Sequence, residues 1–279
     1  MKLCLSRIGM VFVLALLFVS GAGCTLVNKI RAKNELNETA RTYKEGHFEE
    51  AEQHAKRALQ LDPNNPTAPI FIARVVHQQY KPGVDTPENA AKAHEAIEAY
   101  KRVLAKDPDN DEAYKAVSVL YAALKDDQKL REWILARATD PNMKTEKRAE
   151  AYAILAGKDW DCSFKISEEN KSVSTEAGAG KVSYKKPKDP KDFDTATRCV
   201  AHGLEEVNDA IKFDANNEDA WTYQTSLFEE QAKLAEMDGK ADQKAAALKK
   251  AEEARKRKDA LHEENEKRKP SASPAAGGE

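Results

Sequence analysis

The sequence predicts an all-helical protein built from a repeated unit. The chain of 279 residues holds 44 alanines against 12 glycines, and aromatic residues make up only 7% of it. Alanine and the straight-chain residues lose the least side-chain freedom in a helix, so this composition favours helices over an all-β sandwich or barrel. In addition, one short motif that ends in Asp-Pro recurs along the chain at related spacings. Together these observations predict successive pairs of helices.

The first 23 residues have the features of a secretory signal peptide. A positively charged start precedes the mostly apolar run 8–22, which is shorter than the roughly 18 residues that a membrane span needs. The run ends in Ser-Gly-Ala-Gly before Cys24, and this ending resembles the lipobox of bacterial lipoproteins, in which the cysteine is acylated. Gly21 departs from the pattern, because an aliphatic residue is usual there. Ordinary cleavage after Gly23 and an uncleaved anchor are the alternatives.

The lipobox resemblance implies a mature chain that begins at Cys24, with residues 24–31 as a linker and a membrane as the partner of the lipid. Thr25 is not the aspartate that keeps such lipoproteins at the inner membrane in enteric bacteria. The resemblance therefore favours an outer-membrane lipoprotein that faces the periplasm. The formal net charge of −2 provides no field for holding nucleic acid, so we expect no nucleic-acid partner. The sequence leaves the oligomeric state open.

Two cysteines remain once Cys4 leaves with the signal peptide and Cys24 takes the lipid. Cys162 and Cys199 are an even number in an oxidising compartment, where disulfides persist, and we predict that they form a bridge. The alternative is two unpaired cysteines, buried as small apolar side chains. Neither has a second cysteine at close ligand spacing, so we expect no metal site and no cofactor.

The repeat is clearest over residues 44–65. Gly46 turns the chain between two helices, and Ala51 and Ala58 are small where the paired helices approach closely. Pro63 ends the second helix, because a residue before proline is pushed out of the α region. The segment resembles the second half of a tetratricopeptide (TPR) repeat, a helix–turn–helix unit of about 34 residues.

The same ending recurs at Pro108 and Pro141, and again at Ala215, where alanine stands in the place of proline. The successive intervals from Pro63 are 45, 33 and 74 residues, so the second unit carries about eleven extra residues and the fourth about forty. The resemblance implies an all-α, right-handed superhelical solenoid of about five units over 32–258. The units are expected at 32–65, 66–110, 111–142, 143–217 and 218–258.

The large insertion, 164–193, is rich in Gly, Ser and Lys, so we expect a long flexible loop. A small hairpin that pairs 164–166 with 182–184 is the alternative, because both runs alternate. The last helix, 242–268, is expected to pack only up to about residue 258, leaving a charged helix end and a disordered tail over 259–279. Its thin apolar stripe is formed by Leu248, Ala251, Ala254 and Leu261.

No catalytic constellation is evident. The sequence lacks G-x-S-x-G, P-loop and H-E-x-x-H motifs, and no two histidines stand at metal-binding helical spacing. The many carboxylates stand beside Lys and Arg, as on a solvated helix face. Trp160-Asp161-Cys162 lacks the second cysteine of C-x-x-C, so a tryptophan packed on the bridge is favoured over a thiol redox centre. We therefore expect a protein that is not an enzyme.

Two classes of function remain, with a simple storage or spacer lipoprotein as a third. The TPR resemblance implies a binding scaffold for a peptide or a partner helix, at work in assembly of the outer membrane, a pilus or a secretion complex. The alternative is a soluble periplasmic enzyme, or an enzyme's regulatory subunit, that uses residues 164–193. In the TPR family the first helices line the concave face, which implies a partner-binding set of Tyr43, Lys44, Ile70, Arg74, His77, Lys115, Val119, Thr222 and Tyr223.

Overall fold

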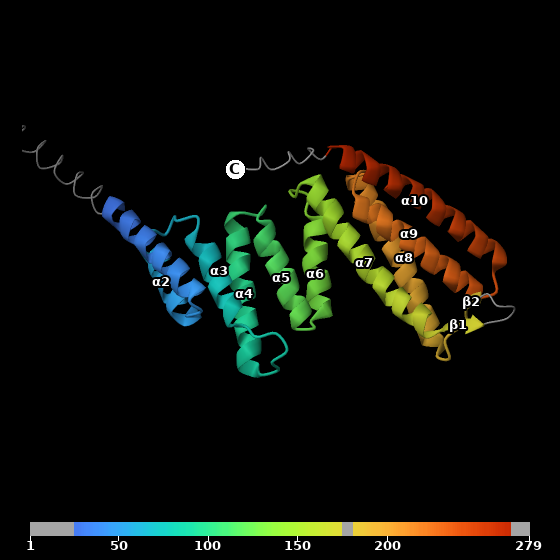
Figure 1. Ribbon diagram of the computed structural model, residues 1–279, viewed down its shortest axis with the longest axis horizontal. Coiled ribbons are helices and arrows are strands. Elements are labelled where there is room, and N and C mark those ends of the chain that lie inside the picture. The colour runs from blue at the N-terminus through green and yellow to red at the C-terminus, as the bar shows by residue number, and fades with distance from the viewer. Residues whose placement is uncertain (1–24, 175–180, 269–279) are drawn as a thin grey trace, which may run out of the picture. The chain divides into compact units, whose positions relative to one another are not determined.

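A computed structural model describes residues 25–174 and 181–268, and these form an all-α protein with one short hairpin (Figure 1). The chain divides into two compact units, up to Leu130 and from Arg131 onward. The expected signal peptide, Cys24 and the tail beyond residue 268 lie outside the described residues. Within the described ranges, none of the helices combines the length and apolar character that crossing a membrane requires.

The first unit consists of helices joined by short turns. A helix over residues 25–44 comes first. The helices that follow are α2 (Phe48–Leu61), α3 (Ala68–Gln79), α4 (Pro87–Lys106) and α5 (Asp111–Ala123). Each of these four packs against the next one along the chain. The next helix, α6 (Asp127–Thr139), begins in this unit and ends in the second.

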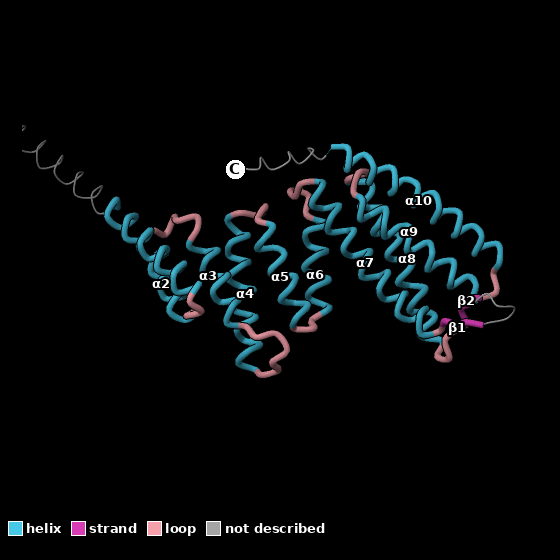
Figure 2. The backbone as a smooth tube through the Cα atoms, in the orientation of Figure 1, coloured by secondary structure: helices cyan, strands magenta, loops and turns pink. Residues whose placement is uncertain are grey.

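The second unit contains longer helices and the hairpin, as the tube in Figure 2 shows. The elements are α7 (Thr145–Glu169), β1 (Lys171–Ser174), β2 (Lys181–Tyr184), α8 (Pro190–Phe213), α9 (Glu218–Met237) and α10 (Ala241–Arg268). Helix α7 packs against α8 and α9, and α9 packs against α10. The strands β1 and β2 pair antiparallel, with Val173 opposite Val182.

The described helices give an all-α, TPR-like fold, and the predicted turn chemistry is confirmed. Gly46 has a positive φ of 81°, a conformation that favours glycine, and Ala51 and Ala58 are fully buried in their helix pair. The second helices α2, α4, α6 and α8 each end one residue before an aspartate of the recurring motif. The Asn110 and Asn217 side chains accept hydrogen bonds from the backbone at the starts of α5 and α9. The superhelical path of the whole array stays a prediction.

Two predicted boundaries differ from the structure. Residues 25–31, expected to be a linker, are the first turns of a helix whose Ala32 is fully buried. At the other end α10 packs beyond residue 258, because Leu261 is buried and His262 lies 2.9 Å from Glu218 of α9. Leu248, expected in the buried stripe, is exposed, and its neighbour Ala247 occupies the inner position instead.

The insertion is not the long flexible loop that its composition predicts. Residues 164–169 extend α7, and α8 already begins at Pro190. The hairpin exists, but its first strand is 171–174 rather than 164–166, because that run is helical. Tyr184 donates its backbone N–H to Glu236 at 3.1 Å, which ties β2 to the end of α9. Most of the insertion is therefore regular structure.

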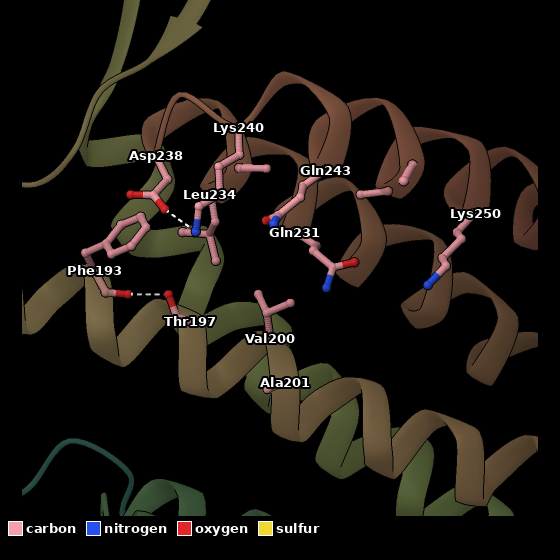
Figure 3. A pocket seen from close by; sticks show the side chains of 13 residues that line it. Phe193, Thr197, Val200, Ala201, Gln231, Leu234, Asp238, Lys240, Gln243 and Lys250 are labelled. Atoms are coloured by element: carbon pink, nitrogen blue, oxygen red, sulfur yellow. Dashed lines mark hydrogen bonds and ion pairs between the residues drawn. The ribbon is translucent and has the colours of Figure 1, made fainter.

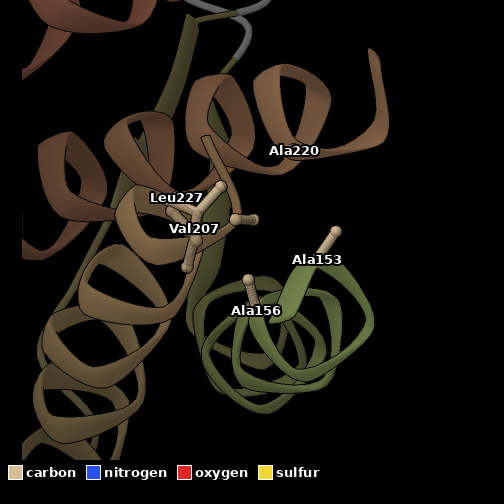
Figure 4. Packing of buried hydrophobic residues seen from close by; sticks show 6 residues of the cluster. Ala153, Ala156, Val207, Ala220 and Leu227 are labelled. Carbon is tan, nitrogen blue, oxygen red and sulfur yellow. The ribbon is translucent and has the colours of Figure 1, made fainter. Parts of the chain in front are cut away.

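The core of the second unit lies where α7, α8 and α9 meet (Figure 4). Gly203 allows the close approach of these helices, since a Cβ there would lie 2.8 Å from Leu227 and 3.1 Å from the Cβ of Asp159. The buried residues of this core are Ala153 and Ala156 of α7, Val207 and Ala210 of α8, and Ala220 and Leu227 of α9.

Candidate functional site

An ion pair aligns the predicted partner-binding residues of α3 with those of α5. Arg74 donates two hydrogen bonds of 2.5 Å to the carboxylate of Glu112, and its guanidinium lies 5.7 Å from the ring centre of Phe71. Glu112 was not predicted for this face, and its hydrogen bonds with Arg74 lower the pKa of its carboxyl. On α3, His77 follows Arg74 by three residues, and on α5, Lys115 follows Glu112 by three. Such spacing places each pair on one helix face.

On this face the half-buried His77 contacts a buried aromatic residue of α4, Tyr100. The Nδ1 atom of His77 lies 3.3 Å from the hydroxyl of Tyr100, and the two rings meet edge to face. Burial lowers the pKa of His77, which favours the neutral ring. Burial also raises the pKa of Tyr100, and the Glu112 and Tyr43 side chains add to this effect. Tyr43 itself packs edge to face on Phe48.

The remaining predicted residues of the first unit differ in their exposure. Lys44, Lys115 and Val119 are exposed, and Ile70 is half-buried. Val119 is 59% exposed and is one of several large apolar side chains on the surface of the described residues. We define the first-helix face as the surface formed by Tyr43, Lys44, Ile70, Arg74, His77, Lys115 and Val119.

The two predicted residues of α9 belong to the second unit. Thr222 is exposed, and its hydroxyl donates to the Glu218 carbonyl at 2.9 Å. Tyr223 is half-buried, and its ring fills the space above Gly157, where a Cβ would lie 2.6 Å from the ring. Trp160 packs on Phe164 and Tyr223, with ring centres at 4.9 and 6.3 Å. Tyr223 therefore contributes packing between α9 and α7.

The predicted bridge between Cys162 and Cys199 is present, with their Cα atoms 6.2 Å apart. It joins the middle parts of α7 and α8 rather than the ends of a loop. Asp159 precedes Cys162 by three residues, and His202 follows Cys199 by three. The two helices run antiparallel, so these two side chains lie on the same side of the bridge, one turn away from it, and face each other. The Nδ1 atom of His202 lies 3.0 Å from Oδ2 of Asp159.

A polar cluster that sequence reasoning missed surrounds this contact. Arg131 donates to Asp159 at 3.1 and 3.3 Å and to Oε1 of Glu206 at 2.5 Å. Burial, together with the neighbouring Asp159 carboxylate, raises the pKa of the Glu206 carboxyl in spite of Arg131. The sequence did contain one signal, because the spacing of Cys199, His202 and Glu206 places them on one face of a helix. The disulfide then makes this face meet α7.

The second unit also has a groove between α8, α9 and α10, shown in Figure 3. Its floor is apolar, with Val200 and Leu234, and amide and amine groups of Gln231, Gln243 and Lys250 line its rim. Nothing in the local sequence pattern distinguishes these residues from the ordinary faces of three helices. Such a groove can accept one apolar side chain with a polar neighbour.

No protein-family model and no curated protein matches the chain. Among solved structures, a crystal structure of the MamA protein is 16% identical, covers 88% of this chain and 98% of its own, and has a TM-score of 0.39. A TPR protein from Parabacteroides merdae is 14% identical, with coverages of 86% and 94% and a TM-score of 0.35. The TPR2AB domain of yeast Sti1, solved with pHSP90, is 19% identical, with coverages of 79% and 98% and a TM-score of 0.30. At such TM-scores these likenesses carry no argument about function.

Proposed function

We propose that the chain is a non-catalytic protein-interaction scaffold that is exported and lipid-anchored at Cys24 in the bacterial cell envelope. In this proposal it is attached to the outer membrane, faces the periplasm and assists the assembly of an envelope complex. The first-helix face takes an extended peptide or a helix of the partner. The lipidation rests on the lipobox resemblance, and the binding surface rests on the geometry of the first unit.

The observation that carries the binding proposal is the alignment of α3 and α5 by Arg74 and Glu112. Lys115 and Val119 are exposed and follow Glu112 on α5 by about one and two turns, and the half-buried His77 follows Arg74 on α3 by one turn. Lysine amines attract carboxylates, and Val119 provides apolar contact. The partner segment expected here is acidic with an apolar anchor residue.

The test is capture of the tagged chain from crosslinked cells that carry one of four forms: wild type, Cys24→Ser, Val119→Asp and Val173→Asp. Val173, in the hairpin of the second unit, is 62% exposed and is therefore a matched control for Val119. The Val119→Asp variant places a negative charge against a partner segment that is expected to be acidic and to insert an apolar anchor residue. We expect the same envelope protein to be recovered with wild type and Val173→Asp, and its recovery to fall at least tenfold with Val119→Asp.

Membrane fractionation of the same cells tests the anchor. Wild type should sediment with the outer membrane, and Cys24→Ser should be released into the soluble periplasmic fraction, since a cysteine-linked lipid holds the chain through its buried CH₂ groups. Equal fractionation of the two forms contradicts the lipid anchor. Equal recovery of the partner with Val119→Asp and Val173→Asp contradicts the binding face.

A further inference from the structure

The side chains of Asp159, His202 and Glu206 converge on one guanidinium nitrogen, Nη2 of Arg131. This nitrogen lies 2.5 Å from Oε1 of Glu206, 2.8 Å from Nδ1 of His202 and 3.3 Å from Oδ2 of Asp159. It carries two hydrogens, so the tautomer of His202 with an unprotonated Nδ1 leaves one of the three contacts without a hydrogen. The second oxygen of Glu206, Oε2, is buried and has no hydrogen-bond partner.

The acceptors belong to side chains that are held in place. The side chain of Glu206 is only 8% exposed, that of Asp159 is 12% exposed, and the two come from neighbouring helices. Both carboxyl groups accept hydrogen bonds from the one Arg131 guanidinium, and Oε2 of Glu206 receives none. Leaving such an oxygen buried without a partner costs free energy.

We propose that Asp159, His202 and Glu206 form a binding site for a divalent transition-metal ion such as Zn²⁺, which takes the place of the Arg131 guanidinium. One ligand atom from each residue can be chosen so that all three lie within 4.8 Å of one another. Around a tetrahedral zinc with bonds of about 2.0–2.2 Å, neighbouring ligand atoms are about 3.4 Å apart. The separations of 3.0 Å from His202 to Asp159 and 3.8 Å from His202 to Glu206 bracket that value.

The ligand types and the access also suit zinc. One imidazole and two carboxylates are a mixed nitrogen and oxygen set, which suits zinc better than magnesium, a metal that prefers oxygen. His202 is the exposed member of the cluster, and it lines a surface depression of about 520 Å³ together with Arg131, Asp159 and Cys199. An ion can therefore reach His202 and Asp159 from solvent. The Arg131 side chain is about one-third exposed.

The test is calorimetric titration of the oxidised full chain, after treatment with a chelator, with Zn²⁺ and separately with Mg²⁺. Four forms are compared: wild type, His202→Ala, Arg131→Met and His262→Ala. His262 is the matched control, since it is 60% exposed beside a carboxylate of Glu218, whereas His202 is 58% exposed beside Asp159. Circular dichroism of each form checks that the helices are intact.

We expect one Zn²⁺ per wild-type chain, no comparable Mg²⁺ binding and no change in His262→Ala. Binding should weaken at least tenfold in His202→Ala and tighten about tenfold in Arg131→Met, because the competing cation is gone. X-ray absorption of the zinc form should show nitrogen and oxygen neighbours at about 2.0–2.1 Å. The proposal is overturned by the absence of stoichiometric zinc, by equal weakening in the two histidine variants, or by an Arg131→Met form that binds no tighter than wild type.

Discussion

At the scale of single residues, the second unit depends on a buried ion pair that no motif announced. Glu230 of α9 is 1% exposed, and its carboxylate accepts hydrogen bonds from the Lys233 amine at 2.6 Å and from the Ser163 hydroxyl at 3.2 Å. Lys233 also lies over the rings of Phe164 and Tyr184. Removing one partner of a buried pair leaves the other charge uncompensated.

We therefore predict that Lys233→Met lowers the free energy of unfolding by about 3 kcal/mol, near the lower end of what such a loss costs. Chemical denaturation with urea measures the change. Lys256→Met is the control, because Lys256 is 74% exposed and its pair with Glu252 is expected to contribute little. The double variant Glu230→Leu with Lys233→Met should recover much of the loss. Similar losses for Lys233→Met and Lys256→Met contradict this account.

His77 makes the first unit sensitive to pH. Burial lowers its pKa in the folded chain, so the unfolded chain binds more protons in the range between the folded value and about 6.5. Stability therefore falls as the pH falls through this range. We predict that the melting temperature drops less between pH 7.5 and pH 5 in His77→Gln than in wild type. His47→Gln, at an exposed histidine, should drop as wild type does.

At the scale of the elements, the disulfide bridge joins α7 and α8 covalently. It closes a loop of 36 intervening residues, and the chain-entropy model assigns such a loop roughly 3–4 kcal/mol. The double variant Cys162→Ser with Cys199→Ser should lose about this much stability in urea denaturation. A double variant as stable as wild type contradicts the assignment.

The helix ends could be predicted from the sequence, because the rules that set them are local. Asp62 and Asp107 each precede a proline, and a residue in that position leaves the α region. The insertion was predicted to be a loop because its composition was judged as a whole. Only its centre is rich in Gly, and its two ends continue the pattern of the neighbouring helices. Residues 164–169 therefore read as part of a loop, although they extend α7.

The candidate sites were less predictable, for a different physical reason. Repeat positions predict Arg74, His77 and Lys115 as binding residues, whereas the contacts of Arg74 with Glu112 and of His77 with Tyr100 arise only through packing between helices. Asp159 and Glu206 stand among many surface carboxylates and are distinguished only by burial. Burial follows from tertiary contacts, which the residues next to them in the sequence do not determine.

At the scale of the whole molecule, the division into two units has an energetic meaning. In repeat proteins, stability is close to a sum of terms for each unit and its nearest neighbours. A change in the second unit should therefore loosen that unit more than the first. The boundary falls inside α6, whose two ends belong to different units.

We predict that the double variant Cys162→Ser with Cys199→Ser raises amide hydrogen exchange in α7 and α8 and leaves α2 to α5 unchanged. Exchange measured by mass spectrometry resolves these helices. An equal rise in both units would mean that the chain unfolds as one cooperative body. The wild-type chain under oxidising conditions is the reference.

The near-equal lengths of α7 and α8, 25 and 24 residues, suggest how the fourth repeat could grow during evolution. The end of α7 and the start of α8 meet at the hairpin. If both helices gain or lose one turn there, the contacts between the rest of α7 and the rest of α8 stay the same. Each residue of α7 then keeps its partner on α8. Length variation among descendants of this gene is therefore expected to fall in paired increments on either side of residues 171–184.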